Sequence, residues 1–212
     1  MNDSEFEKSV FINCPFDNEF APLLEAMLFC VVYAGLKPRL ASESVEAGAS
    51  RLDTIIEIIG QCKYSIHDLS RCRATEVDEY LRMNMPFELG MDMGFRKGPG
   101  EDTNGKKFII FESEPYDLKR ALSDLAGTDV EFHRNNFQTL MKKLRDFVRV
   151  EIGVTLPGAT KLESDYYTFQ GWMIEKKMDE GHTESEATAL PTRERLDEML
   201  AWIGLGKPTE FT

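Results

Sequence analysis

Short apolar runs alternate, along the first 150 residues, with longer segments whose apolar residues recur every three or four positions. The short runs predict strands, because they are rich in β-branched and aromatic residues and end at turn residues. They are SVFIN at 9–13, LKPRLA at 36–41, YSIHD at 64–68, KFIIF at 107–111 and TDVEF at 128–132. The segments between and after them predict helices at 23–35, 52–60, 86–97, 116–125 and 137–148.

Alternation of this kind is typical of a parallel sheet that helices cover on both faces. With right-handed crossovers it predicts a doubly wound α/β fold, flavodoxin-like or Rossmann-like, with five parallel strands within residues 1–153. Residues 154–212 predict a C-terminal helical extension, with amphipathic patterns around Trp172 and Met199. The apolar faces of these helices are expected to pack on the domain or on a second subunit, so we expect a homo-oligomer.

Composition limits the class of protein. The chain has 212 residues, 42% of them hydrophobic, which is enough to bury one full core. Its formal charge of −12 argues against nucleic acid or an anionic membrane as a partner, since both require clustered Lys and Arg. No segment approaches the roughly 20 apolar residues of a membrane span, and the acidic start MNDSEFEKS is unlike a secretory signal, so we expect a cytoplasmic location. The four cysteines show no CxxC pairing, and neither a metal site nor a disulfide framework is expected.

Ligands of open parallel sheets bind beyond the carboxyl ends of the strands. The segments at that edge are NCPFDNEF, ASESVEAG, HDLSR together with NMPFELG, and ESEPYD. None contains GxGxxG or a P-loop, which argues against a nicotinamide dehydrogenase and a P-loop NTPase. Three of the four are acidic, which favours a site that binds sugar hydroxyls and uses carboxylate chemistry. We expect no resident cofactor.

Glu88 stands in the apolar stretch NMPFELG and has two interpretations. Pro86 is the expected first helical residue, so Glu88 would be the third, where a glutamate caps a helix. Met85, however, cannot complete the reciprocal bond of a capping box, and the apolar neighbours predict a buried acid. The exposed amides of the first helical turn would keep that acid ionised. An ionised, partly desolvated carboxylate is a good nucleophile toward a sugar carbon.

A strand ending in HDLS, then MPFELGMDMGFRKG, then the strand KFIIF resembles the core of the nucleoside 2-deoxyribosyltransferase-like superfamily. The FINCPFD loop belongs to the same resemblance, which extends to the related TIR-like domains and covers about residues 8–150. The chain is also similar to a set of uncharacterised bacterial proteins, some with suspected roles in defence. The resemblance implies cleavage or transfer at an N-glycosidic bond of a nucleoside, a nucleotide or an NAD-like substrate, with NAD as substrate and not as cofactor.

By this resemblance Glu88 matches the nucleophile that captures the anomeric carbon, and Asp68 matches an acid that holds the base or the sugar. Arg82 stands near the place where relatives often have a second base-binding acid, which leaves base transfer in doubt and bond cleavage open. The expected substrate-binding residues are Asn13, Cys14, Pro15, Phe16, Asp17, His67, Asn84, Met85, Pro86 and Phe87.

Two further side chains have open roles. His67 could protonate the leaving base, or its ring could be satisfied inside the sheet, since strand alternation points it away from Asp68. Asp92, one helical turn beyond Glu88, could pair with that carboxylate or face solvent. The preferred function is an N-glycosidase or glycosyltransferase with Glu88 as nucleophile and a nucleoside or nucleotide as small-molecule partner. The alternatives are a non-catalytic nucleotide-binding sensor or signalling module and a structural assembly protein.

Overall fold

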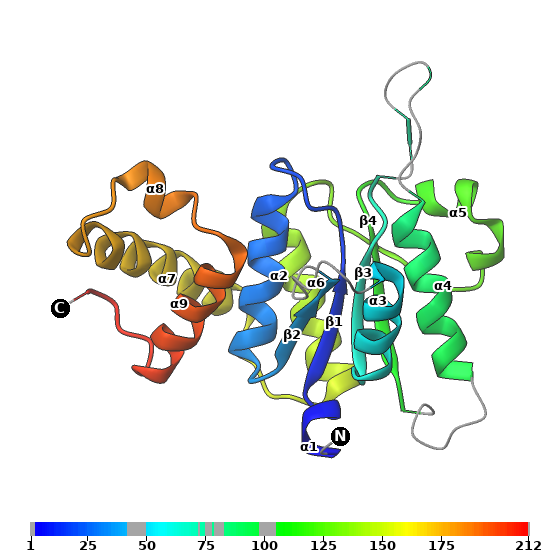
Figure 1. Ribbon diagram of the computed structural model, residues 1–212, viewed down its shortest axis with the longest axis horizontal. Helices are drawn as coiled ribbons and strands as arrows, with labels where there is room; N and C mark the ends of the chain where they lie inside the picture. Colours follow the sequence, from blue (N-terminus) through cyan, green and yellow to red (C-terminus); the bar gives the residue numbers. More distant parts are fainter. Residues whose placement is uncertain are drawn as a thin grey trace.

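Five strands form one parallel sheet in the computed structural model of the chain, in the order β2, β1, β3, β4, β5 (Figure 1). Their bounds are β1 (Ser9–Asn13), β2 (Lys37–Leu40), β3 (Tyr64–Asp68), β4 (Lys107–Glu112) and β5 (Glu131–Phe132). Every neighbouring pair is parallel, which confirms the predicted sheet. The structure describes residues 3–41, 50–71, 73–74, 78, 83–97 and 105–211.

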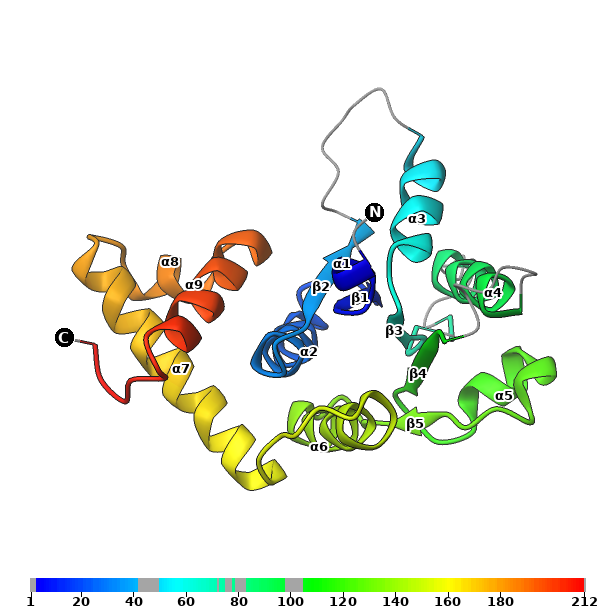
Figure 2. The ribbon, with the colours of Figure 1, turned by 90° about the horizontal axis from the view of Figure 1, so that it is seen from below.

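Helices cover both faces of this sheet, as Figure 2 shows. One face carries α2 (Ala21–Tyr33) and α6 (Phe137–Phe147), and the other carries α3 (Arg51–Gly60) and α4 (Asn84–Lys97). Side chains of the central strands alternate accordingly: Ile12 and Ile66 pack with α2, whereas Phe11 packs with α3. The fold is therefore a doubly wound α/β sandwich.

Three C-terminal helices lie on the left in Figure 1: α7 (Ala159–Asp179), α8 (Glu184–Thr188) and α9 (Thr192–Gly204). α7 and α9 pack against α2, and α8 packs against α7. Phe29 of α2 is central to this contact. Its ring centroid lies 5.7 Å from that of Phe169 in α7 and 5.9 Å from that of Trp202 in α9, and all three side chains are fully buried. The helical extension thus shares an apolar core with the helices of the sheet.

Short elements complete the chain: α1 (Asp3–Phe6), α5 (Asp117–Ala121), the 3₁₀ turn η3 (Ser123–Leu125) and the π-helical turn η4 (Val148–Ile152). β5 has two residues where the sequence predicts five, because the chain is still turning at Thr128, whose N–H bonds to the Leu125 carbonyl at 2.9 Å. None of the described helices has the length and apolar character that a membrane span requires.

The start of α4 also differs from the prediction. The helix begins at Asn84, and the Phe87 N–H already bonds to the Met83 carbonyl at 3.1 Å. Pro86 is the third helical residue and not the first, which is tolerated because N–H groups in a first turn have no helical partner. Glu88 is consequently the fifth helical residue, two positions too far along the helix to act as a capping-box glutamate.

Candidate active site

The carboxyl ends of β1 and β3 meet the start of α4 at the upper edge of the sheet in Figure 1. Asn13, the last residue of β1, lies in register with His67 of β3. His67 bonds to Asp92 of α4, whereas the next residue, Asp68, bonds to His133 after β5. Strand alternation therefore sends His67 and Asp68 to opposite faces of the sheet, and each enters a separate polar cluster.

The Asn13 amide joins β3 to the start of α4. Its Nδ2 lies 3.0 Å from His67 Nδ1 and donates to the Met85 carbonyl at 2.9 Å. The two hydrogens on Nδ2 are then both used, and His67 Nδ1 is an acceptor. The proton of the neutral ring therefore lies on Nε2, which donates to Asp92 Oδ2 at 2.9 Å. Both ring nitrogens are occupied, as expected for a histidine that is satisfied inside the sheet.

The sequence suggested that Asp92 either pairs with Glu88 or faces solvent, and the structure shows neither arrangement. It is fully buried and forms an ion pair with Lys106, whose Nζ lies 3.0 Å from Oδ1. The same Nζ donates to two carbonyls at and just after the end of α3. Burial raises the pKa of the Asp92 carboxyl, but the hydrogen bond from His67 and the charge of Lys106 outweigh it, and the pKa falls to about 2. Asp92 is thus an anchor that ties α4 to α3 and β3.

Glu88 lies one turn before Asp92 and has a different environment. It is 7% exposed, and no described residue forms a hydrogen bond or an ion pair with its carboxylate. Burial raises the pKa of Glu88 to about 7, although the charge of Arg51 lowers it. The expectation that helix amides keep this carboxylate fully ionised is wrong, because the free amides of the first turn belong to residues that precede it.

Asp68 is the centre of the second cluster. The Asn135 N–H donates to His133 Nδ1 at 3.0 Å, so the neutral ring carries its proton on Nε2. That Nε2 lies 2.9 Å from both Asp68 Oδ2 and Ser70 Oγ. A nucleophilic triad needs the acid and the hydroxyl on opposite ring nitrogens, so this cluster is not one. Asp68 Oδ1 also accepts from the N–H and the hydroxyl of Ser70, which fixes the loop after β3.

Carboxylates from three segments surround Cys14. Burial raises the pKa of its thiol well above the ordinary value, and the negative charges of Asp68, Glu88 and Asp17 raise it further. Charge effects of this kind require proximity, so Asp68, Glu88 and the loop after β1 that carries Asp17 all lie near this thiol. A thiol held in its protonated form is not a nucleophile.

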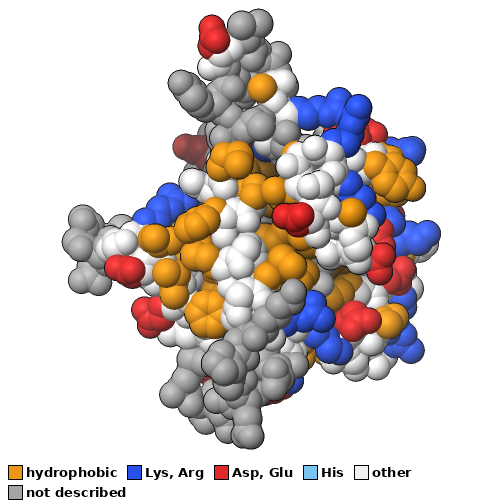
Figure 3. Space-filling model, turned by 90° about the vertical axis from the view of Figure 1, so that its right-hand side faces the viewer, with side chains coloured by type: hydrophobic (Ala, Val, Ile, Leu, Met, Phe, Trp, Pro, Cys, Tyr) orange, Lys and Arg blue, Asp and Glu red, His pale blue; other side chains and the backbone are white. Residues whose placement is uncertain are grey.

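Exposed apolar side chains, here called the rim, occur in the segments that carry Cys14 and Glu88. Phe16 and Phe87 are 46% and 58% exposed, and Met83, just before α4, is 61% exposed. Figure 3 shows hydrophobic side chains gathered on the face of the molecule that carries α4. Behind Phe16 the loop is held in place, since Arg71 Nη2 donates to Asp17 Oδ1 at 2.9 Å.

The structure thus gathers many of the residues that the sequence proposed. The buried set is Asn13, Cys14, Pro15, His67, Asp68, Met85 and Glu88; Asp17 and Pro86 are half-buried, and Phe16, Asn84 and Phe87 are exposed. Lys106, Ser70 and the contact of His133 with Asp68 were missed. His133 directly follows β5, and its position at the same edge as Asp68 is the one signal that could have found it. Residues 42–48 of the predicted segment ASESVEAG, and Arg82, lie outside the described residues.

A scan against protein-family models and a search of curated proteins both returned no match to this chain. The resemblance to the nucleoside 2-deoxyribosyltransferase-like and TIR-like proteins therefore stays a prediction from the motifs. Within the described ranges, no group of three His, Cys, Asp or Glu side chains could hold a metal ion.

Proposed function

We propose that the chain cleaves or transfers an N-glycosidic bond of a nucleoside, a nucleotide or an NAD-like substrate, with Glu88 as the reactive carboxylate. One observation carries the proposal: a buried carboxylate at the carboxyl edge of a parallel sheet has no partner among the described residues and a pKa raised to about 7. Such a group destabilises the fold when it is ionised, and perturbed acids in this position are typical of active sites.

The chemistry follows from the charge that develops on the sugar. As the bond between the anomeric carbon and the base nitrogen breaks, the electron pair leaves with the base and the sugar becomes cationic. Ionised Glu88 stabilises that positive charge or bonds to the carbon. Water or another acceptor then displaces the carboxylate from the carbon and releases a proton to solvent.

The environment of the histidines favours a base that is already cationic. Both ring nitrogens of His67 and of His133 are bonded, so neither ring has a free proton for a departing base. A nicotinamide in NAD carries its positive charge before cleavage and leaves without protonation. Its charge would also lower the pKa of Glu88 on binding, which increases the ionised fraction at neutral pH.

Substrate binding would use the rim and the neighbouring acids. Phe16 and Phe87 expose flat apolar rings on which a base could stack. Asp17 and Asp68 supply acceptors for sugar hydroxyls near Glu88. Because the Asp68 oxygens already accept from Ser70 and His133, a sugar hydroxyl would have to replace one of these bonds.

The test is release of free base from NAD and from a panel of nucleosides by the wild type, Glu88→Gln and Glu57→Gln. Glu57 is an exposed acid of α3 and serves as the matched control. We expect wild type and Glu57→Gln to release base at equal rates. Glu88→Gln should lose at least about 100-fold in rate and bind substrate with similar affinity, as titration calorimetry would show.

Two results would contradict this function. Binding without turnover in the wild type would favour the alternative, a nucleotide-binding sensor. Absence of both binding and turnover across the panel would refute a nucleotide site altogether. Light scattering on the same samples tests the expected homo-oligomer.

A further inference from the structure

The fifth position of the sheet is only partly filled. β5 pairs with the last two residues of β4, Phe111 and Glu112, and the first four residues of β4 have no neighbour on that side in the described part of the chain. β4 is therefore an edge strand over most of its length, although its sequence KFII is that of a buried strand.

The backbone of this open edge has unpaired polar groups. The Lys107 N–H bonds to the Lys63 carbonyl, and the Phe111 carbonyl accepts from Leu69, so the odd-numbered residues of β4 face β3. Alternation then turns the N–H and C=O of Phe108 and the N–H of Ile110 to the opposite edge. Among the described residues none bonds to these three groups.

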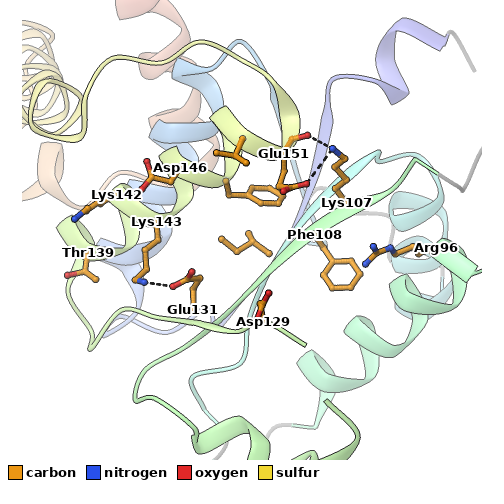
Figure 4. A pocket seen from close by; sticks show the side chains of 13 residues that line it. Arg96, Lys107, Phe108, Asp129, Glu131, Thr139, Lys142, Lys143, Asp146 and Glu151 are labelled. Carbon is orange, nitrogen blue, oxygen red and sulfur yellow. Dashed lines mark hydrogen bonds and ion pairs between the residues drawn. The ribbon is translucent and has the colours of Figure 1, made fainter. Parts of the chain in front are cut away.

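A hollow of about 650 Å³ lies against this edge, between β4, β5, α6 and the end of α4 (Figure 4). It reaches both faces of the sheet. Phe108 and Arg96 line it on the face that carries α4, and Ile109, Phe147 and Val150 line it on the face that carries α6. A strand placed beside β4 would send its alternate side chains to these two faces.

The charges of the hollow distinguish the two faces. On the α6 side two of the three cations are paired, Lys107 with Glu151 and Lys143 with Glu131 (Figure 4). The third, Lys142, lines the hollow together with Asp146, one helical turn along α6. On the α4 side Arg96 lies over the Phe108 ring, with its guanidinium carbon 5.1 Å from the centroid, and no described carboxylate pairs with it. An occupant should therefore bring an acidic side chain to this face and an apolar one to the other.

The opposite edge of the sheet shows how such an edge is protected. The Lys37 N–H bonds to the Lys8 carbonyl, so the next residue of β2, Pro38, faces outward. Proline has no N–H to offer, and β2 cannot form a complete ladder with another strand. The open part of β4 has no proline.

We propose that this groove, formed by the open edge of β4 and the side chains that flank it, binds an extended peptide segment of a partner protein as an added strand. The segment pairs its backbone with Phe108 and Ile110 and alternates apolar and acidic side chains. The proposal does not depend on the reaction assigned to Glu88.

The probe is the labelled heptapeptide SEVEVES, with SKVKVKS as its basic counterpart, titrated into the full chain and followed by fluorescence anisotropy. We expect SEVEVES to bind at least about tenfold more tightly than SKVKVKS. Arg96→Glu should reverse this preference, while Arg193→Glu, an exposed arginine on α9, should leave it unchanged. Failure of either peptide to saturate, or an unchanged preference in Arg96→Glu, overturns the proposal.

Backbone pairing is tested by methylating peptide nitrogens. In a strand, the N–H groups of every second residue point to the same edge. Methylating the nitrogens of both valines therefore blocks one edge of the peptide, and methylating those of the first and third glutamates blocks the other. One set should lower affinity at least about tenfold and the other should have little effect. Equal losses, or no loss from either set, exclude strand addition.

Hydrogen exchange locates the bound peptide. In the free protein the amides of Phe108 and Ile110 should exchange faster than those of Ile109 and Phe111, which face β3. Bound SEVEVES should slow the amides of Phe108 and Ile110 and leave those of Ile109 and Phe111 unchanged. Equal protection of the four amides in the free protein would mean that the edge is already covered. Protection that rises with protein concentration alone would assign the groove to a second copy. Either result overturns the proposal.

Discussion

Substituting Glu88 by glutamine should make the protein more stable at neutral and basic pH. Burial raises the pKa of this carboxyl from 4.5 to about 7 in the folded chain, whereas an unfolded chain restores the ordinary value. The folded state therefore holds the proton more tightly. The stability that this group contributes is complete below about pH 4.5 and is lost as the pH rises through 7.

The magnitude follows from the shift. Each pKa unit corresponds to about 1.4 kcal/mol, so ionised Glu88 lowers the free energy of unfolding above pH 7 by up to about 3 kcal/mol. Glutamine removes the charge and keeps the shape. We expect the stability gap between Glu88→Gln and wild type to widen by that amount from pH 4.5 to 8.5, or by roughly 6–12 °C in Tm for a chain of this length.

The assay is urea denaturation of wild type, Glu88→Gln and a control at half-unit pH steps. Glu112→Gln is the matched control, since this buried acid accepts two backbone N–H groups at 2.7 Å and its glutamine variant should be less stable than wild type at pH 7. A pH-independent gap for Glu88→Gln would refute a desolvated carboxylate. A variant less stable than wild type at pH 8 would show that the charge of Glu88 holds the fold together.

Three further predictions concern the same edge. Lys106→Met should lower the free energy of unfolding by about 3 kcal/mol, because Asp92 would keep a buried charge without its cation; a loss below about 1 kcal/mol would contradict this. Asn13→Ala should lower the free energy of unfolding by about 2 kcal/mol, because the Met85 carbonyl loses its donor and the start of α4 is held less firmly. If Glu88 is catalytic, the same change should lower kcat more than it changes KM, whereas an unchanged kcat would limit Asn13 to a structural role. Base release at low substrate should rise with pH through about 7 and then level, because the nucleophile must be ionised, whereas a profile that falls over this range would show Glu88 acting as an acid.

The sheet was predictable because local patterns determine it. Four of the five strands follow from runs such as SVFIN and KFIIF, whose burial makes them apolar on both faces. Two elements differ from these patterns at their ends. β5 is short because the turn that follows η3 extends to Thr128, the first residue of TDVEF. α4 starts two residues early because a proline is harmless anywhere in a first turn.

The site was predictable only in part. The place of Glu88 follows from the rule that ligands bind beyond the carboxyl ends of parallel strands, and its burial from the apolar stretch around it. The bond between Asp68 and His133 joins residues 65 positions apart, and no local pattern encodes it. Lys106 reads as the solvated start of a strand, and only the packing of α3 against α4 explains why it is 3% exposed.

Two carboxylates one turn apart on α4 have opposite environments, and this contrast is the strongest argument about function. Asp92 receives a proton donor from β3 and a cation from the start of β4, and its pKa falls to about 2. Glu88 receives neither a hydrogen bond nor an ion pair from the described residues, and burial raises its pKa to about 7 although the charge of Arg51 lowers it. If α4 served stability alone, a hydrogen-bond donor or a cation beside each of the two buried carboxylates would make the fold more stable. The polar anchors fix the helix and leave Glu88 without a partner among the described residues, so a desolvated acid is held at the edge where parallel sheets bind their ligands. This is the arrangement that the proposed function requires.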